Sequence, residues 1–179
     1  KTTALFQVAR ELLSEKKLGL QKVIISSTTH FGAWQIPLAD RHIRANDVHS
    51  LATSFNNELR GVILVTGETK EDRTQALDAE SLVWLQEHAK NTNTPLLLEA
   101  DGSRTHSFKA PAAHEPAIPN FSDIVIVVAG LSTIGMQLND EHVHRAEIFS
   151  ELTQTPLQQT ITPDSVLQLL IHPQGGMKN

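Results

Sequence analysis

Short, continuous apolar runs alternate with amphipathic helical patterns along this chain, and the alternation constrains its fold more than any other feature. The apolar runs cover residues 23–26, 61–66, 96–100 and 124–129. Strands that are apolar throughout are typical of parallel sheets with both faces covered by helices. The sequence therefore predicts an α/β fold, with a mostly parallel sheet as the middle of three layers.

Helical patterns separate or follow these runs. In the first, apolar residues recur at the spacing of a one-sided helix, and Gly19 is expected to end it; they are Leu5, Val8, Ala9, Leu12 and Leu13. Further helices are expected over residues 74–90, 143–152 and 164–171. No internal repeat is visible, so we expect residues 1–179 to form a single domain.

Composition narrows the class of partner. The 179 residues are 40% apolar, carry a net charge of -5 and contain no cysteine. An acidic chain lacks the basic surface that nucleic acid or an anionic membrane requires, and no apolar run approaches the roughly 20 residues that span a bilayer. Without cysteine, neither disulfides nor thiolate metal sites can form. We therefore expect a cytoplasmic protein with a small soluble partner, and no nucleic-acid or membrane partner.

Lys1, Thr2 and Thr3 open the first helical pattern. They match the end of a phosphate loop, G-x-x-x-x-G-K-[ST], in which the lysine pairs with the β- and γ-phosphates and the next hydroxyl binds Mg²⁺. We assign these roles to Lys1 and Thr2. A Lys-Thr pair that merely caps a helix is the alternative. The chain starts within this motif and ends on a glycine-containing tail, so we expect the domain to be truncated at both ends.

Two carboxylates, Glu99 and Asp101, end the third apolar run. Their i, i+2 spacing would place both side chains on one side of a strand, as in a Walker B strand. Either could bind Mg²⁺ through water or orient an attacking water. We assign Asp101 to the metal and Glu99 to the water, with a simple Asp101-Gly102 turn as the alternative.

Two polar loops are further candidates. Thr28, Thr29 and His30 follow the first apolar run and could contact phosphate or Mg²⁺, or only cap a turn. A proline-rich loop over residues 109–116 carries a cation, an imidazole and a carboxylate; they are Lys109, His114 and Glu115. This loop could close over a substrate as a lid, or be a surface connection.

Other conspicuous residues favour structural roles. His142 and His144 do not face one another on a helix, so a solvated helix start is favoured over a metal site. Trp34 and Trp84 are predicted to be packing residues.

Several separated segments together resemble the YqeC-type selenium-dependent hydroxylase accessory family, a P-loop nucleotide-binding family. The segments are residues 1–3, 28–30, 99–104, 109–111, 114–116, 128–130 and 143–145. The resemblance implies a strand and a glycine-rich loop before Lys1, and a strand after Asn179 that helps to read the base. It also adds Ser103 and Arg104 to the substrate or lid residues.

The resemblance implies an accessory protein in the maturation of molybdenum hydroxylases that use labile selenium. Three functions remain open. The first is an ATP or GTP hydrolase that requires Mg²⁺. The second is a kinase or ATP-dependent ligase acting on a small co-substrate. The third is a non-catalytic, nucleotide-gated binding module that presents its shape to a client hydroxylase or a cofactor-maturation protein.

Overall fold

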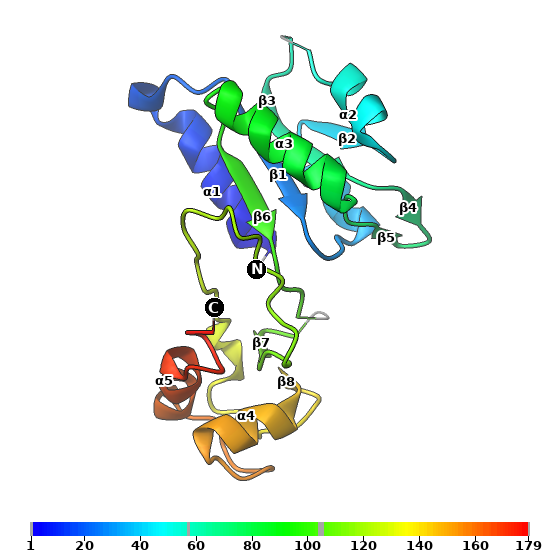
Figure 1. Ribbon diagram of the computed structural model, residues 1–179. Coiled ribbons are helices and arrows are strands. Elements are labelled where there is room, and N and C mark those ends of the chain that lie inside the picture. The colour runs from blue at the N-terminus through cyan, green and yellow to red at the C-terminus, as the bar shows by residue number, and fades with distance from the viewer. Residues whose placement is uncertain (1, 57, 104–105, 179) are drawn as a thin grey trace. The chain divides into compact units, whose positions relative to one another are not determined.

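The computed structural model describes residues 2–56, 58–103 and 106–178, which divide into two compact units. We call residues 2–100 the sheet unit and residues 101–178 the C-terminal unit (Figure 1). The sheet unit contains α1 (Thr2–Ser14), η1 (Lys16–Leu18), β1 (Lys22–Ser27), η2 (Ala33–Leu38), β2 (Arg41–Arg44), α2 (Val48–Ser54), β3 (Gly61–Thr66), β4 (Thr69–Lys70), β5 (Arg73–Thr74), α3 (Ala79–Asn91) and β6 (Leu96–Glu99). The C-terminal unit contains β7 (Phe108–Lys109), η3 (Leu131–Thr133), β8 (Val143–His144), α4 (Ala146–Thr153) and α5 (Pro163–Ile171).

The main sheet has the strand order β2-β3-β1-β6, and every neighbouring pair in it is parallel. Ile24 pairs with Ile63, and Ser27 pairs with Glu99. Three of the four predicted strands are therefore confirmed as parallel neighbours. β6 stops one residue earlier than predicted, at Glu99.

Helices cover both faces of this sheet, because neighbouring strand residues point to opposite sides. Ile24 packs on one side in a core with Leu51 of α2 and Leu85 of α3. Ile25 packs on the other side in a core with Phe6 of α1. The predicted three-layer α/β arrangement is confirmed for the sheet unit.

Local capping explains where the helices begin. The helix predicted over residues 74–90 begins at Ala79 rather than Thr74, because Asp78 caps α3 by accepting a hydrogen bond of 2.8 Å from the Ser81 amide. The hydrogen bonds from Ser81 hold the pKa of Asp78 below its usual value. Gly19 ends η1 with a positive φ of 61°, a conformation in which glycine carries no steric cost.

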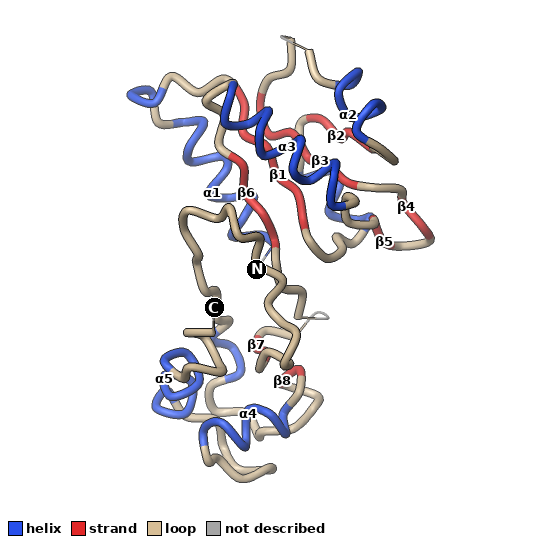
Figure 2. The backbone as a smooth tube through the Cα atoms, in the orientation of Figure 1, coloured by secondary structure: helices blue, strands red, loops and turns tan. Residues whose placement is uncertain are grey.

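The predicted strand over residues 124–129 is wrong. Figure 2 shows the chain from residue 110 to residue 130 as loop. Ile124 and Ile126 are 81% and 70% exposed. A strand requires a neighbouring edge for its backbone groups, and no described strand pairs with this segment. The apolar pattern alone could not supply that partner.

The C-terminal unit has a small core of its own, in which Phe108 of β7 and Phe149 of α4 meet edge to face. The helix predicted from residue 143 begins only at Ala146, because Val143 and His144 form β8 and Arg145 adopts a left-handed conformation. α5 begins at Pro163, one residue before the prediction. None of the described helices is long and apolar enough to cross a bilayer.

A half-buried histidine packs against two aromatic rings of the sheet unit. His88 stacks on Trp84 at a ring distance of 5.0 Å and lies 4.7 Å from the ring of Phe55. Its Nε2 atom is buried and makes no hydrogen bond within the described part of the chain. Burial, assisted by the charge of Lys22, lowers the pKa of His88.

We expect the sheet unit to lose stability as the pH falls below about 6.5. A group whose pKa is lowered by folding takes up protons first in the unfolded chain, so acid favours unfolding. His42, whose pKa is lowered by burial and by Arg44, acts in the same direction. Between pH 8 and pH 5, the melting temperature should fall less in His88→Leu than in the wild type. An unchanged slope in His88→Leu, matching that of the exposed control His49→Leu, would contradict this account.

Candidate functional site at the carboxyl edge of the sheet

The first turn of α1 and the end of β6 meet at the carboxyl edge of the parallel sheet (Figure 1). The Thr2 hydroxyl donates a hydrogen bond of 2.7 Å to Oε2 of Glu99, which lies 97 residues further along the chain. Both side chains are half-buried. A hydroxyl at a helix start thus lies beside a carboxylate at a strand end. Thr3, in the same turn, is exposed.

The loop after β1 reaches the same edge through Ser27, which pairs with Glu99 in the sheet. The Ser27 hydroxyl and the Thr28 amide both donate to the backbone carbonyl of Glu99, at 2.9 and 3.1 Å. The Thr29 amide donates to the Ser27 hydroxyl at 2.8 Å. Thr28 therefore lies next to the backbone of Glu99, and Thr29 is held to Ser27 by a turn-type hydrogen bond.

His30 has a different neighbour. Its Nδ1 lies 3.0 Å from the carbonyl of Thr74, and because a carbonyl only accepts, Nδ1 must donate. Nε2 of a neutral ring is then an acceptor. The imidazole is exposed and bonds β5 rather than Thr2 or Glu99.

Asp101 belongs to the C-terminal unit, where the Lys109 ammonium donates to its carboxylate. Because β6 ends at Glu99, Asp101 lies outside the strand, and the alternation that would align the two carboxylates does not reach it. An ammonium beside a carboxylate competes with a metal ion for the same oxygens. The assignment of Asp101 to the metal stays a prediction.

Lys109 and Glu115 belong to one ion network. The Lys109 side chain is only 3% exposed; its Nζ also lies 2.7 Å from Oε2 of Glu115 and donates to the Gly102 carbonyl at 2.8 Å. Arg145 binds both oxygens of Glu115, at 2.6 and 3.0 Å. Two cations thus meet two carboxylates, so the network is neutral.

The neighbouring cations lower the pKa of Glu115. Burial alone would raise the pKa of Glu115, but hydrogen bonds from Arg145 and Lys109 outweigh it and lower the pKa to about 2. Sequence reasoning did not select Arg145 as a site residue. Its signal was the segment 143–145 of the family resemblance.

Two of the remaining predicted residues, Ser103 and His114, belong to the C-terminal unit. Ser103 donates to the His106 carbonyl at 2.6 Å and so closes a local turn. His114 has an 81% exposed side chain whose Nε2 lies 3.9 Å from Glu115. Lys1 and Arg104 lie outside the described residues.

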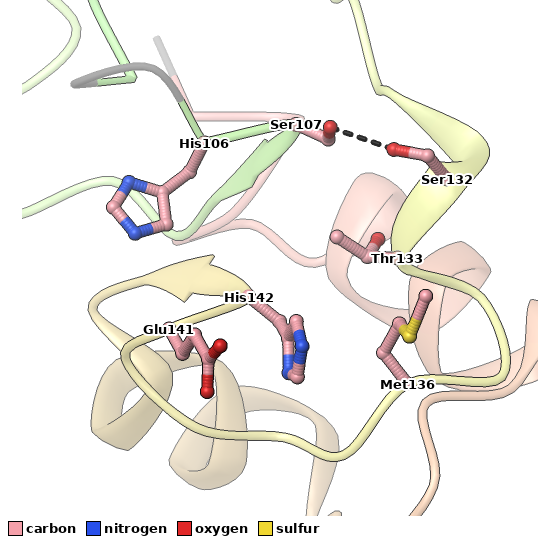
Figure 3. Close-up of a pocket in the computed structure, with 7 residues that line it drawn as sticks. All are labelled: His106, Ser107, Ser132, Thr133, Met136, Glu141 and His142. Atoms are coloured by element: carbon pink, nitrogen blue, oxygen red, sulfur yellow. Dashed lines mark hydrogen bonds between the residues drawn. The ribbon is translucent and has the colours of Figure 1, made fainter.

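The C-terminal unit also holds an open, polar pocket of about 340 Å³. Figure 3 shows its lining, which is His106, Ser107, Ser132, Thr133, Met136, Glu141 and His142. Ser132 donates to Ser107 at 2.6 Å across its upper rim. Sequence reasoning chose none of these residues for a site. Within the described ranges, no group of three or more His, Asp or Glu side chains is placed to hold a metal ion.

Comparison with known proteins identifies the family. Over 84 residues the chain is 43% identical to the uncharacterized protein YqeC of Escherichia coli (strain K12). That match covers 47% of this chain and 33% of the relative, so it spans a third of the relative's length. No solved structure matches the chain. Residues 1–147 match the family model of the YqeC protein, and the chain therefore belongs to the YqeC family.

Proposed function

We propose that this chain forms part of a nucleoside-triphosphate-binding protein that uses Mg²⁺ with ATP or GTP. The observation that carries the proposal is the 2.7 Å hydrogen bond between Thr2 and Glu99. Ligands of open parallel α/β sheets bind beyond the carboxyl ends of the strands, and the start of a helix favours negative charge. The sequence motif, the sheet edge and the helix start all point to a phosphate-bearing ligand.

Each residue of this edge has a definite role in the proposal. Lys1 would pair with the β- and γ-phosphates, and the Thr2 hydroxyl would be a ligand of Mg²⁺. Glu99 would accept a hydrogen bond from the attacking water or from a water bound to the metal. Mg²⁺ keeps several waters and takes few protein ligands, so one hydroxyl and one carboxylate suffice beside the phosphates.

In hydrolysis at this site, a bond forms between the oxygen of water and the γ-phosphorus. The bond between the γ-phosphorus and the β–γ bridging oxygen breaks, and that oxygen leaves with the diphosphate. Glu99 holds the water in line and receives its proton. The hydrogen bond that holds Thr28 beside Glu99 restricts where that water can stand. We propose that this activity serves an accessory role in the maturation of a selenium-dependent molybdenum hydroxylase, as the family resemblance implies.

Lys1→Ala should weaken the binding of Mg²⁺-ATP and Mg²⁺-GTP by about 100-fold, because a charge-assisted contact to phosphate is lost. Titration calorimetry on the full-length protein measures this effect. Lys16→Ala is the matched control, since Lys16 is an exposed lysine of η1. Equal affinity for wild type and Lys1→Ala would sink the proposal.

Phosphate-release assays on the same protein separate the three open functions. A hydrolase turns over Mg²⁺-nucleotide alone, and a kinase or ligase does so only with a small co-substrate. A nucleotide-gated binding module binds without turnover. We expect slow turnover by the protein alone.

A further inference from the structure

An exposed tryptophan lies on the segment that follows the candidate site. Trp34 is the second residue of η2 and lies four residues after His30 in the sequence. Its side chain is exposed, with 72% of the residue's surface accessible. It was predicted to be a packing residue, and that prediction is wrong. Trp84, the second of the two tryptophans in the chain, is half-buried against Phe55 and His88.

The backbone beneath Trp34 is firmly anchored at the carboxyl edge. Phe31 is buried and makes an edge contact with Phe6 of α1. Gly32 forms a bridge with Arg73 of β5, and the Ala33 amide donates to the Asp72 carbonyl at 2.7 Å. The β4–β5 hairpin that holds this segment directly follows β3 (Figure 1). Trp34 therefore projects from a fixed base rather than from a loose loop.

Gly32 also leaves room for the indole. A Cβ atom at this position would lie 2.5 Å from Nε1 and 2.8 Å from Cδ1 of Trp34. The edge of the indole thus lies against bare backbone, in a space that any other residue would fill. The Gly32 amide is bound by the Gln35 side chain at 2.9 Å, which holds the glycine in place. The anchored backbone reduces the conformational freedom that this segment would lose on binding a ligand.

We propose that Trp34 is a stacking platform for a purine ring. A flat, exposed indole offers a π-face to nucleobases, which stack on aromatic side chains with little dependence on base identity. The same part of the chain carries two polar groups that could bind the edge of such a ring: His30, four residues before Trp34, and Arg73, whose backbone bridges to Gly32 and whose side chain is 60% exposed. The inference deepens the proposed function and rests on it, because it assigns the base-binding surface of the same sheet edge.

The purine could belong to the bound triphosphate or to a second, purine-containing substrate. Both share the stacking chemistry, and competition separates them. Adenosine that competes with Mg²⁺-ATP occupies the base position of the same nucleotide. If adenosine binds equally well in the presence of Mg²⁺-ATP, it occupies the site of a second, purine-containing substrate.

The test uses Trp84→Phe, which leaves Trp34 as the sole tryptophan of residues 1–179, with the double variant Trp34→Phe/Trp84→Phe as the emission blank. Titration with adenosine, guanosine, Mg²⁺-ATP or Mg²⁺-GTP should quench this emission in a saturable manner. In the otherwise wild-type protein, Trp34→Ala should weaken binding of the quenching ligand by about 10-fold, the loss expected for one base stack. Trp34→Phe should retain most of the affinity.

Gly32→Ala provides a sharper variant, because it keeps the indole but displaces it. Its φ of -68° is open to alanine, so the substitution acts through the Trp34 contact rather than through the backbone conformation. We expect about a threefold to tenfold weaker binding, with the same melting temperature as the wild type.

The outcomes distinguish this inference from the proposed function. If calorimetry shows Mg²⁺-ATP binding that Lys1→Ala abolishes, but no purine ligand quenches Trp34, the inference is overturned and the proposed function stands. If purines quench Trp34 while Lys1→Ala retains full affinity for the triphosphate, the proposed function fails and the platform stands. Equal affinity of Trp34→Ala and wild type for every purine ligand also overturns the inference.

Discussion

Glu99→Gln should lower Mg²⁺-dependent phosphate release by about 100-fold or more, while the affinity for Mg²⁺-nucleotide changes by less than about threefold. The amide of glutamine keeps the shape of Glu99 and can still accept the Thr2 hydrogen bond. It cannot receive a proton from an attacking water. Binding and turnover should therefore separate, which single-turnover phosphate release and calorimetry measure side by side.

Asp101→Asn is the matched control, because it makes the same chemical change two residues further along the chain. If Asp101 holds the metal, its substitution also reduces turnover more than binding. Its contact with Lys109 instead predicts a loss of stability in the C-terminal unit. We expect the larger loss of turnover at Glu99, because Glu99 is the carboxylate that the Thr2 hydroxyl reaches.

A double-mutant cycle tests whether Thr2 and Glu99 act together. Thr2→Ala and Glu99→Gln touch the same hydrogen bond and the same proposed metal shell, so their effects on turnover should be strongly non-additive. Fully additive losses would mean that the two residues act independently. If Glu99→Gln turns over nucleotide at the wild-type rate, Glu99 has no role in the reaction.

Pattern reasoning succeeded for the buried strands of the main sheet and for the first helix. The buried runs at residues 23–26 and 61–66 became strands because their side chains are apolar on both faces. The position of α1 followed from its one-sided apolar pattern, and its start brought Thr2 to the sheet edge as predicted. The motif predicted Asp101 as the carboxylate that shares the metal with Thr2, whereas the carboxylate that Thr2 contacts in the structure is Glu99.

Choosing between the two carboxylates required tertiary information. Glu99 and Asp101 were equally eligible in sequence, and only the end of β6 and the location of Lys109 distinguish them. Residues 124–129 show the same limit, since an apolar run specifies burial but not the edge that would pair with it. Trp34 shows the opposite error, because a large apolar side chain that was expected to be buried is exposed.

The C-terminal unit yields the second large prediction. Lys109→Met should destabilise this unit by about 3 kcal/mol, since removal of one partner from a buried ion network leaves a carboxylate poorly compensated. The Lys109 side chain is nearly inaccessible, and it donates to Asp101, Gly102 and Glu115. Methionine fills a similar volume, so loss of charge rather than loss of packing dominates the effect. For a unit of this size, calorimetric unfolding should show a fall in melting temperature of roughly 12–24 °C.

The pH dependence identifies the network as the cause. The pKa of Glu115 is lowered to about 2 in the folded chain from its usual 4.5, so its stabilising contribution is complete above pH 4.5. That contribution is lost progressively as the pH falls from 4.5 towards 2. Allowing for solvent screening, it amounts to about 1–2 kcal/mol. Glu115→Gln should therefore be less stable than the wild type at pH 6 and should approach it near pH 2.

Lys70→Met is the control for Lys109→Met, because Lys70 is an exposed residue of β4 and its loss should change stability by less than about 0.5 kcal/mol. A Lys109→Met protein as stable as this control would mean that Lys109 does not hold the unit together. The ammonium would then be available to a ligand, as the lid interpretation of residues 109–116 requires. A large loss of stability, with nucleotide binding intact in the folded fraction, would make Lys109 a structural cation and leave His114, exposed beside Glu115, as the residue of this loop available to a substrate.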